Sequence, residues 1–213
     1  MTNQGSRDEI LNRIRETVVR RPKQAYTTGY QSDDIFMPVK DALGTFIEEL
    51  EAVGGKCFVA QSEDELLQML TELYHDRGFG SLYCKDEKLV TTISKMNIKL
   101  TNSEDDFENM QAGVTRCECL VARTGSVLVS SATGPGRQMH AFPPVHIVLA
   151  DESQLVAYPG DALRLLQQKY GNNLPSAISF ITGPSRTADI EKTLVMGAHG
   201  PKELYLFLTE SNK

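Results

Sequence analysis

A nine-residue segment near the C-terminus, residues 183–191, combines residue types that could bind an anion. Its sequence, Gly-Pro-Ser-Arg-Thr-Ala-Asp-Ile-Glu, follows an apolar run typical of a buried strand. The pattern predicts a helix over residues 187–195 that is capped by Ser185 or Thr187. Free N–H groups at the helix start, together with the guanidinium of Arg186, would then bind a phosphate or carboxylate. The alternative is that the hydroxyls only cap the helix and Arg186 points to solvent.

Two glycine-containing turns could complete such a site. Residues 122–126 (Ala-Arg-Thr-Gly-Ser) and 134–137 (Gly-Pro-Gly-Arg) bracket an expected strand at 127–130. Glycine-rich turns are common in hairpins, but an arginine in each turn favours a shared anion site. The predicted ligand-binding residues are Thr124, Gly125, Ser126, Arg137, Gly183, Ser185, Arg186, Thr187 and His199.

His199 lies between small residues in the segment Gly-Ala-His-Gly-Pro at 197–201, which leaves room for a ligand. The alternative is a simple turn histidine, because a loop from a helix to a strand normally lies opposite the active face. His140 and His146 follow within six residues of one another. Neither helical spacing nor a nearby carboxylate supports a metal site there, so we expect no bound metal.

The elements that must position these residues can be identified from capping boxes and apolar periodicity. Ser62 and Glu65 form one capping box, and Ser6 and Glu9 begin a separate N-terminal helix. Helices are expected at 39–53, 62–75, 87–95, 104–111, 161–170 and 187–195, and strands at 56–60, 81–84, 98–100, 177–182 and 203–208. Three more apolar runs without intervening helices, at 127–130, 146–150 and 155–157, predict an antiparallel meander.

This order predicts an α/β fold with a mainly parallel sheet flanked by helices and an antiparallel β insertion. We expect an N-terminal helix and linker over residues 1–38 and one α/β domain over 39–213. Ligands in such folds bind beyond the carboxyl ends of the strands, so we expect residues 185–187 there, facing the turn at 124–126. The N-terminal helix could pack on a partner, on a second copy in a homo-oligomer, or on its own domain.

The composition excludes several classes of protein. A net charge of −6 and a pI near 5.3 argue against nucleic-acid binding, which requires a basic surface. No apolar run reaches the length of a membrane span, and the polar N-terminus does not resemble a signal peptide, so we expect a cytoplasmic protein. The sequence lacks the G-x-G-x-x-G, Walker A, G-x-S-x-G and H-E-x-x-H motifs.

The four cysteines, Cys57, Cys84, Cys117 and Cys119, form no C-x-x-C pair. This spacing fits neither a zinc site nor an iron–sulfur cluster. We therefore expect small buried thiols and no intrinsic cofactor in this chain.

Several short motifs, taken in order, resemble the lactate-utilisation protein C family, which is built on the LUD domain. The resemblance covers residues 39–213 and is dense from residue 113 onward. The residues that carry it are Gly113-Val114-Thr115, Ala122 with Thr124-Gly125-Ser126, Pro143-Pro144 with His146-Ile147, the segment 183–191, and Gly197 with His199-Gly200-Pro201.

The resemblance implies a fold similar to the ribose-phosphate isomerase and CoA-transferase group. It also implies a role in oxidising L-lactate to pyruvate alongside partner subunits that carry iron–sulfur clusters, with a small carboxylate or other anion bound here. Arg123 departs from the family pattern, because that position is often acidic, which puts the ligand preference in question. Two alternatives stay open: an independent enzyme acting on a phosphorylated sugar or CoA ester, with Glu118 as the nucleophile, and a non-enzymatic module that binds a metabolite.

Overall fold

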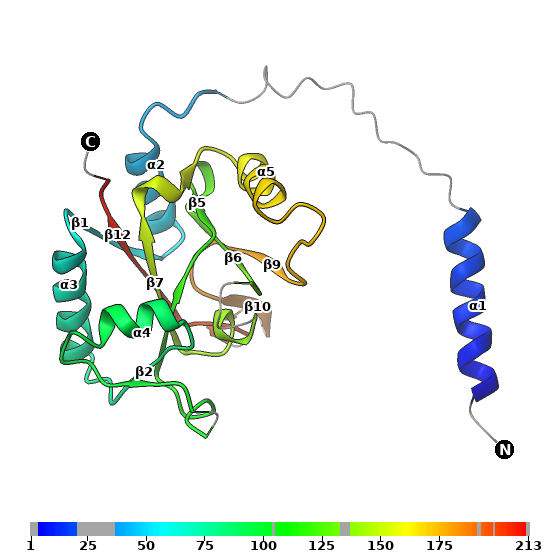
Figure 1. The fold of residues 1–213 in the computed structure, drawn as a ribbon, viewed down its shortest axis with the longest axis horizontal. Coiled ribbons are helices and arrows are strands. Elements are labelled where there is room, and N and C mark those ends of the chain that lie inside the picture. The colour runs from blue at the N-terminus through cyan, green and yellow to red at the C-terminus, as the bar shows by residue number, and fades with distance from the viewer. Residues whose placement is uncertain are drawn as a thin grey trace. The chain divides into compact units, whose positions relative to one another are not determined.

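The computed structural model describes residues 4–20, 37–103, 105–132, 137–190, 193–197 and 199–211, and it divides into two compact units, Met1–Met37 and Pro38–Lys213 (Figure 1). The first unit contains α1 (Gln4–Arg20), which begins two residues before Ser6. Ile10 and Ile14 on this helix are exposed. Among the described residues, no helix is both long and apolar enough to cross a membrane.

The second unit alternates helices and strands and ends with a long strand. Its helices are α2 (Ala42–Ala52), α3 (Glu63–Asp76), α4 (Glu87–Ile93) and α5 (Pro159–Tyr170), with short 3₁₀ helices η2 (Ala122–Thr124), η3 (Arg137–His140) and η4 (Glu152–Gln154). Its strands are β1 (Lys56–Ala60), β2 (Leu82–Tyr83), β3 (Leu100–Thr101), β4 (Ala112–Arg116), β5 (Cys119–Val121), β6 (Ser126–Ser130), β7 (Val145–Asp151), β8 (Leu155–Val156), β9 (Ile178–Ile181), β10 (Arg186–Ile190), β11 (Thr193–Met196) and β12 (Glu203–Thr209).

A six-stranded sheet forms the centre of this unit. Its order is β1-β12-β7-β4-β2-β3, and every neighbouring pair is parallel. The predicted α/β fold with a parallel sheet is therefore confirmed. The central strands β7 and β12 are buried along almost their whole length, as expected for a parallel sheet covered on both faces.

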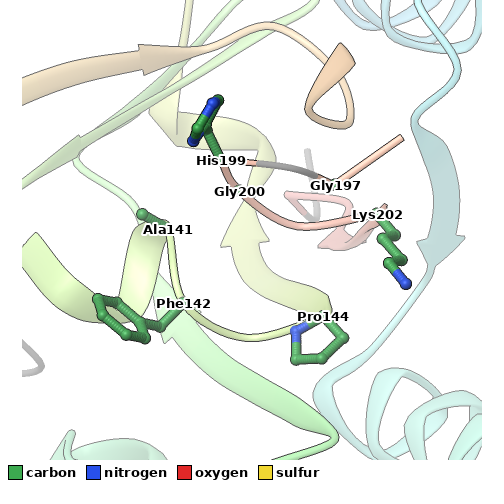
Figure 2. A pocket seen from close by; sticks show the side chains of 7 residues that line it. All are labelled: Ala141, Phe142, Pro144, Gly197, His199, Gly200 and Lys202. Carbon is green, nitrogen blue, oxygen red and sulfur yellow. The ribbon is translucent and has the colours of Figure 1, made fainter. Parts of the chain in front are cut away.

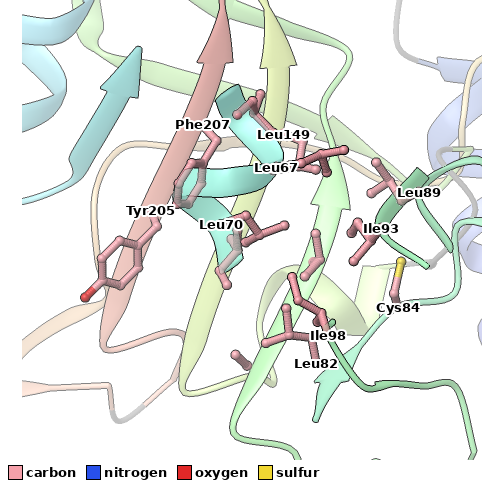
Figure 3. Close-up of a cluster of buried hydrophobic side chains, with 14 of the residues drawn as sticks. Leu67, Leu70, Leu82, Cys84, Leu89, Ile93, Ile98, Leu149, Tyr205 and Phe207 are labelled. Atoms are coloured by element: carbon pink, nitrogen blue, oxygen red, sulfur yellow. The ribbon is translucent and has the colours of Figure 1, made fainter. Parts of the chain in front are cut away.

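Alternate residues of the central strands enter two different cores. Ile147 and Phe207 point to one face, where α3 and α4 pack over them in the cluster shown in Figure 3. Val148 and Leu206 point to the other face and meet Phe46 and Leu50 of α2. Successive side chains of a strand point to opposite faces of the sheet, so a strand that is covered on both faces contributes to two cores.

A second sheet of four strands, in the order β8-β5-β6-β9, lies on the α2 side of the central sheet. Leu120 and Val127 from this sheet enter the same core as α2, whereas Leu128 on its opposite face packs against Leu166 of α5. The pairs β5·β6 and β6·β9 are antiparallel, and β5·β8 is parallel. This sheet is the antiparallel part of the predicted architecture.

The helix predicted over residues 187–195 is wrong. The chain forms an antiparallel hairpin of β10 and β11 there. Ser185 donates its N–H to the carbonyl of Pro201 at 2.8 Å, and Gly197 donates to the carbonyl of Ser185 at 3.0 Å. These two bonds fix the backbone on both sides of the hairpin, at Ser185 and at Gly197. The Thr, Leu and Val residues of the segment suit strands as well as helices, so local pattern did not decide between them.

The prediction of an antiparallel meander is also wrong, because the three strands expected in it belong to two different sheets. β7 lies between β12 and β4 in the central sheet, while β6 and β8 lie in the second sheet. Turns replace the helix expected at 104–111 over the described residues 105–109, where acidic residues and Asn favour turns. Strands β4 and β5, which were not predicted from the sequence, complete the two sheets.

Candidate functional site

A cleft of about 530 Å³ lies beside the loop that connects β9 to the β10–β11 hairpin. A second cavity of about 360 Å³ adjoins it and shares Ala141, His199 and Gly200 in its lining. The larger cleft is lined by Val53, His140, Ala141, residues 180–186 and residues 199–201. Of the predicted ligand-binding residues, the structure therefore brings together Gly183, Ser185, Arg186 and His199.

The cleft lies at the amino ends of the central strands, opposite the edge that we expected. Residues 140–144 immediately precede β7, and residues 199–202 immediately precede β12. Lys202 donates its N–H to the carbonyl of Pro144 at 2.8 Å, and this bond joins the two segments. The placement of residues 185–187 at the carboxyl end of a parallel strand is wrong as well, because β9 pairs antiparallel with β6 in the second sheet.

Figure 2 shows the smaller cavity, which is formed by the segments that precede β7 and β12. Phe142 and Pro144 extend from the segment before β7, while His199 and Lys202 extend from the segment before β12. The ring of Phe142 is 62% exposed, and its inner side contacts the ring of Phe107 with centroids 5.1 Å apart. The cavity therefore combines an open aromatic ring with an ammonium group.

Arg186 has a structural partner as well as a place in the cleft. Its Nη2 donates to the carbonyl of Val53 at 2.7 Å, and Val53 is the residue that ends α2. A carbonyl at a helix C-terminus lacks an intrahelical partner and carries partial negative charge, so a guanidinium stabilises it. The contact uses one of five guanidinium N–H donors, and Arg186 is exposed. Among the described residues no other group accepts from this guanidinium, so its remaining donors can bind a ligand.

The turn at 124–126 does not line the cleft. Ser126 is buried and bonds through Oγ to Thr124 Oγ1 at 2.8 Å and to Thr182 Oγ1 at 2.7 Å. Gly125 has a φ of 55°, and a Cβ there would lie 2.2 Å from the backbone N of Leu50. These residues hold α2 against the second sheet, which is a structural role. The side chains of two other predicted residues, Arg137 and Thr187, lie outside what the structure describes.

The residues with ionisable side chains that line the two cavities are arginine, lysine and histidine. Arg186, His140 and His199 line the larger cleft, and Lys202 lines the smaller one. Within the part of the chain that the structure describes, neither lining includes a carboxylate. Such a set of donors suits a small anion, with Arg able to bind a carboxylate through two parallel hydrogen bonds.

His140 belongs to this cleft although the sequence argument did not choose it. Its ring lies 6.0 Å from the ring of His146, measured between centroids. His146 is fully buried on β7, and its Nε2 bonds to Thr115 Oγ1 of β4 at 2.8 Å. Burial lowers the pKa of both histidines, and His146, which also faces His140, falls to about 3. The only signal in the sequence was their short separation across two prolines.

No group of three or more metal-ligating side chains forms among the described residues. Three cysteines, Cys84, Cys117 and Cys119, are buried, and Cys57 is partly buried. Burial raises the pKa of Cys119 to about 12 and that of Cys84 to about 11. These thiols are held in the protonated, unreactive form at neutral pH.

Glu118 does not lie near the turn at 124–126, as the CoA-transferase alternative required. It adjoins the opposite end of β6, where its carboxylate accepts hydrogen bonds from Ser130, from Tyr170 at 2.8 Å and from Lys169 at 2.7 Å. Burial favours a higher pKa, but these hydrogen bonds outweigh it and leave the pKa of Glu118 lowered. A buried carboxylate with this many partners is poorly placed to act as a nucleophile.

Comparison with known proteins gives one family. The LUD domain model matches residues 43–209. Lactate utilization protein C from Shouchella clausii is 28% identical over 226 residues and covers 96% of this chain and 98% of its own. The protein of the same name from Geobacillus thermodenitrificans is 28% identical over 210 residues, which cover 96% of this chain and 80% of the relative. A crystal structure of a DUF162 family protein from Deinococcus radiodurans has the same fold, with a TM-score of 0.62 at 15% identity over 81% of this chain and 99% of that one.

Proposed function

The chain belongs to the LUD domain family, and on this basis we propose that it is a subunit of a system that oxidises L-lactate and that its cleft binds a small carboxylate. The observation that carries the proposal is the nearly end-to-end similarity to proteins named lactate utilization protein C. A similarity spread over 96% of this chain includes the elements that build the cleft as well as those that build the core.

The chemistry of the cleft supports a carboxylate ligand. Its lining offers Arg186, the hydroxyl of Ser185 and the imidazole of His199. A volume of about 530 Å³ lies within the usual range for small-molecule pockets. Arg186 is held in place by its bond to Val53, so little side-chain freedom is lost when a ligand binds.

Oxidation of lactate to pyruvate releases two electrons, which need an acceptor. The cysteine spacing of this sequence does not match the motifs that ligate iron–sulfur clusters. We therefore place the iron–sulfur clusters of the proposed system in partner subunits, with this chain supplying the carboxylate site. The exposed Phe142 beside the smaller cavity is a suitable contact for such a partner.

The binding part of the proposal is tested by titrating L-lactate and pyruvate into the purified protein by calorimetry. We expect Arg186→Ala to weaken binding by about tenfold or more, since a charge-assisted hydrogen bond contributes about 1.5–3 kcal/mol. Arg123→Ala is the matched control, because Arg123 also contacts α2, through Glu49 at 3.1 Å, but lies outside the cleft. Equal binding by wild type and Arg186→Ala would contradict the placement of the carboxylate.

The cellular part is tested by deleting the gene in its host and measuring growth on L-lactate as the sole carbon source. We expect growth to stop and to return when the wild-type gene is restored. A tagged chain should co-purify with proteins that contain iron and acid-labile sulfide. Normal growth of the deletion strain, or purification of the chain without such partners, would count against the proposed system.

A further inference from the structure

Two ring nitrogens beneath the cleft are buried and have no hydrogen-bond partner among the described residues: Nε2 of His140 and Nδ1 of His146. The second nitrogen of His146 is occupied by Thr115. A buried polar atom without a partner costs about 1–3 kcal/mol, so such atoms are rare in native proteins unless they serve a purpose. Two of them on neighbouring rings, one of which lines the cleft, need an explanation.

The distance between the two rings indicates how these nitrogens can be satisfied. A ring nitrogen lies roughly 1.1 Å from its centroid and an N–H···N bond spans about 3 Å, so directly bonded imidazoles have centroids about 5 Å apart. The observed separation is 6.0 Å. With the two nitrogens turned toward each other, a ring movement of about 1 Å would close a direct bond.

We propose that Thr115, His146 and His140 form a hydrogen-bonded chain that runs from β4 through β7 to the cleft, where His140 contacts the oxygen on the second carbon of a 2-hydroxy or 2-keto acid. His140 is the ligand-contacting residue, and His146 and Thr115 are positioning residues that act through it. The proposal rests on the proposed function, because Arg186 binds the carboxylate of the same ligand.

The chain of neutral rings can transmit hydrogen bonds in either direction. If Thr115 donates to His146, then His146 donates to His140, and His140 donates its remaining N–H to a keto oxygen. If each bond is reversed, the same nitrogen of His140 accepts from a hydroxyl. Burial keeps both rings in the neutral form that this reversal requires. One site can therefore hold either the hydroxy acid or the keto acid, whereas a fixed charge would favour one of them.

The first test compares L-lactate and pyruvate with propionate, which has the same carboxylate but no oxygen on the second carbon. We expect wild type to bind lactate and pyruvate about tenfold more tightly than propionate, which corresponds to one hydrogen bond. His140→Phe should lose this preference and bind the three acids with affinities equal to within about twofold. His75→Phe, which alters an exposed histidine on α3, is the matched control and should keep the tenfold preference. A preference retained in His140→Phe, or equal binding by wild type, would overturn the inference.

The second test needs no ligand and separates this inference from the proposed function. Two-bond ¹H–¹⁵N spectra report which ring nitrogen of each histidine carries the proton. We expect Thr115→Val to change the tautomer populations of both His146 and His140, because the effect passes along the chain. A change confined to His146 would refute the hydrogen-bonded chain of side chains whatever the binding data show. If that hydrogen-bonded chain is present but the wild-type protein binds none of the acids, the proposed carboxylate ligand is wrong instead.

Discussion

Gly125 offers a sharp test of the packing between η2 and α2. The residue has a φ of 55°, and a Cβ built there would lie 2.2 Å from the backbone N and 2.6 Å from the Cα of Leu50. Both atoms belong to the backbone of α2, so no side-chain rotation can relieve the contact. Gly125→Ala therefore forces either the turn or the helix to move by about 1 Å to reach an ordinary contact distance.

The expected cost has two parts. A residue with a Cβ is about 1–2 kcal/mol less stable than glycine in the left-handed backbone conformation. Displacement of α2 adds about 1–3 kcal/mol, the usual cost of overpacking, because Phe46 and Leu50 on this helix are fully buried. We expect a total loss of about 3–4 kcal/mol, and hence a melting temperature lower by about 10 °C.

Gly78→Ala separates the two parts. Gly78 has a φ of 63° at the left-handed position that follows α3, where it donates to the carbonyl of His75, but nothing lies within 4 Å of its Cβ position. Urea unfolding followed by circular dichroism should show this variant losing only the backbone part, about 1–2 kcal/mol. If the two variants lose the same stability to within about 0.5 kcal/mol, the contact with α2 is not what requires a glycine at Gly125.

Replacements at three other sites test buried polar groups. The pKa of His146 falls to about 3 on folding, so below pH 6.5 the unfolded chain binds a proton that the folded protein does not. The free energy of unfolding therefore decreases as the pH falls, by up to about 1.4 kcal/mol per pH unit. His146→Phe should make this slope shallower in urea titrations at several pH values, and an unchanged slope would contradict the prediction. Glu118→Ala should cost about 2 kcal/mol by chemical unfolding because it removes the buried acceptor of the Ser130 and Tyr170 hydroxyls, whereas half-exposed Lys169 can be solvated, and Glu118→Gln should cost less. Asp86→Ala should cost about 2 kcal/mol in the same assay, because Asp86 caps α4 and accepts from the partly exposed Arg116 at 2.7 Å, and a loss below about 0.5 kcal/mol would argue against both roles.

Local pattern predicted most helices because their signals lie within one element. Ser62 caps α3 by accepting from the N–H of Glu65, as the capping box indicated, and Leu66, Leu67 and Leu70 form its buried stripe. The hairpin at residues 186–196 was missed because its conformation depends on backbone bonds from Ser185 to partners outside the hairpin. Such long-range backbone bonds leave no periodic pattern in the sequence.

The candidate site was predicted in part. Arg186 and His199 lie in one cleft, as their residue types suggested, but the reason is the proximity of two loops rather than a helix N-terminus. Gly125 and Ser126 form a motif just as conspicuous in the sequence, yet Gly125 packs on the backbone of α2 and Ser126 bonds to Thr182 of the second sheet's edge loop. Sequence motifs do not distinguish a glycine needed for ligand access from one needed for close packing of a helix.

The sequence by itself determined the α/β class, the family resemblance and the segment that carries Arg186, because apolar periodicity and motif order are properties of the chain. Only the tertiary structure decided that the cleft lies at the amino edge of the sheet and that Thr115, His146 and His140 meet there. Thr115 and His146 are 31 residues apart, and they meet because β4 pairs with β7 in a fixed parallel register. That register is set by burial on both faces of the sheet, which no local stretch of sequence contains.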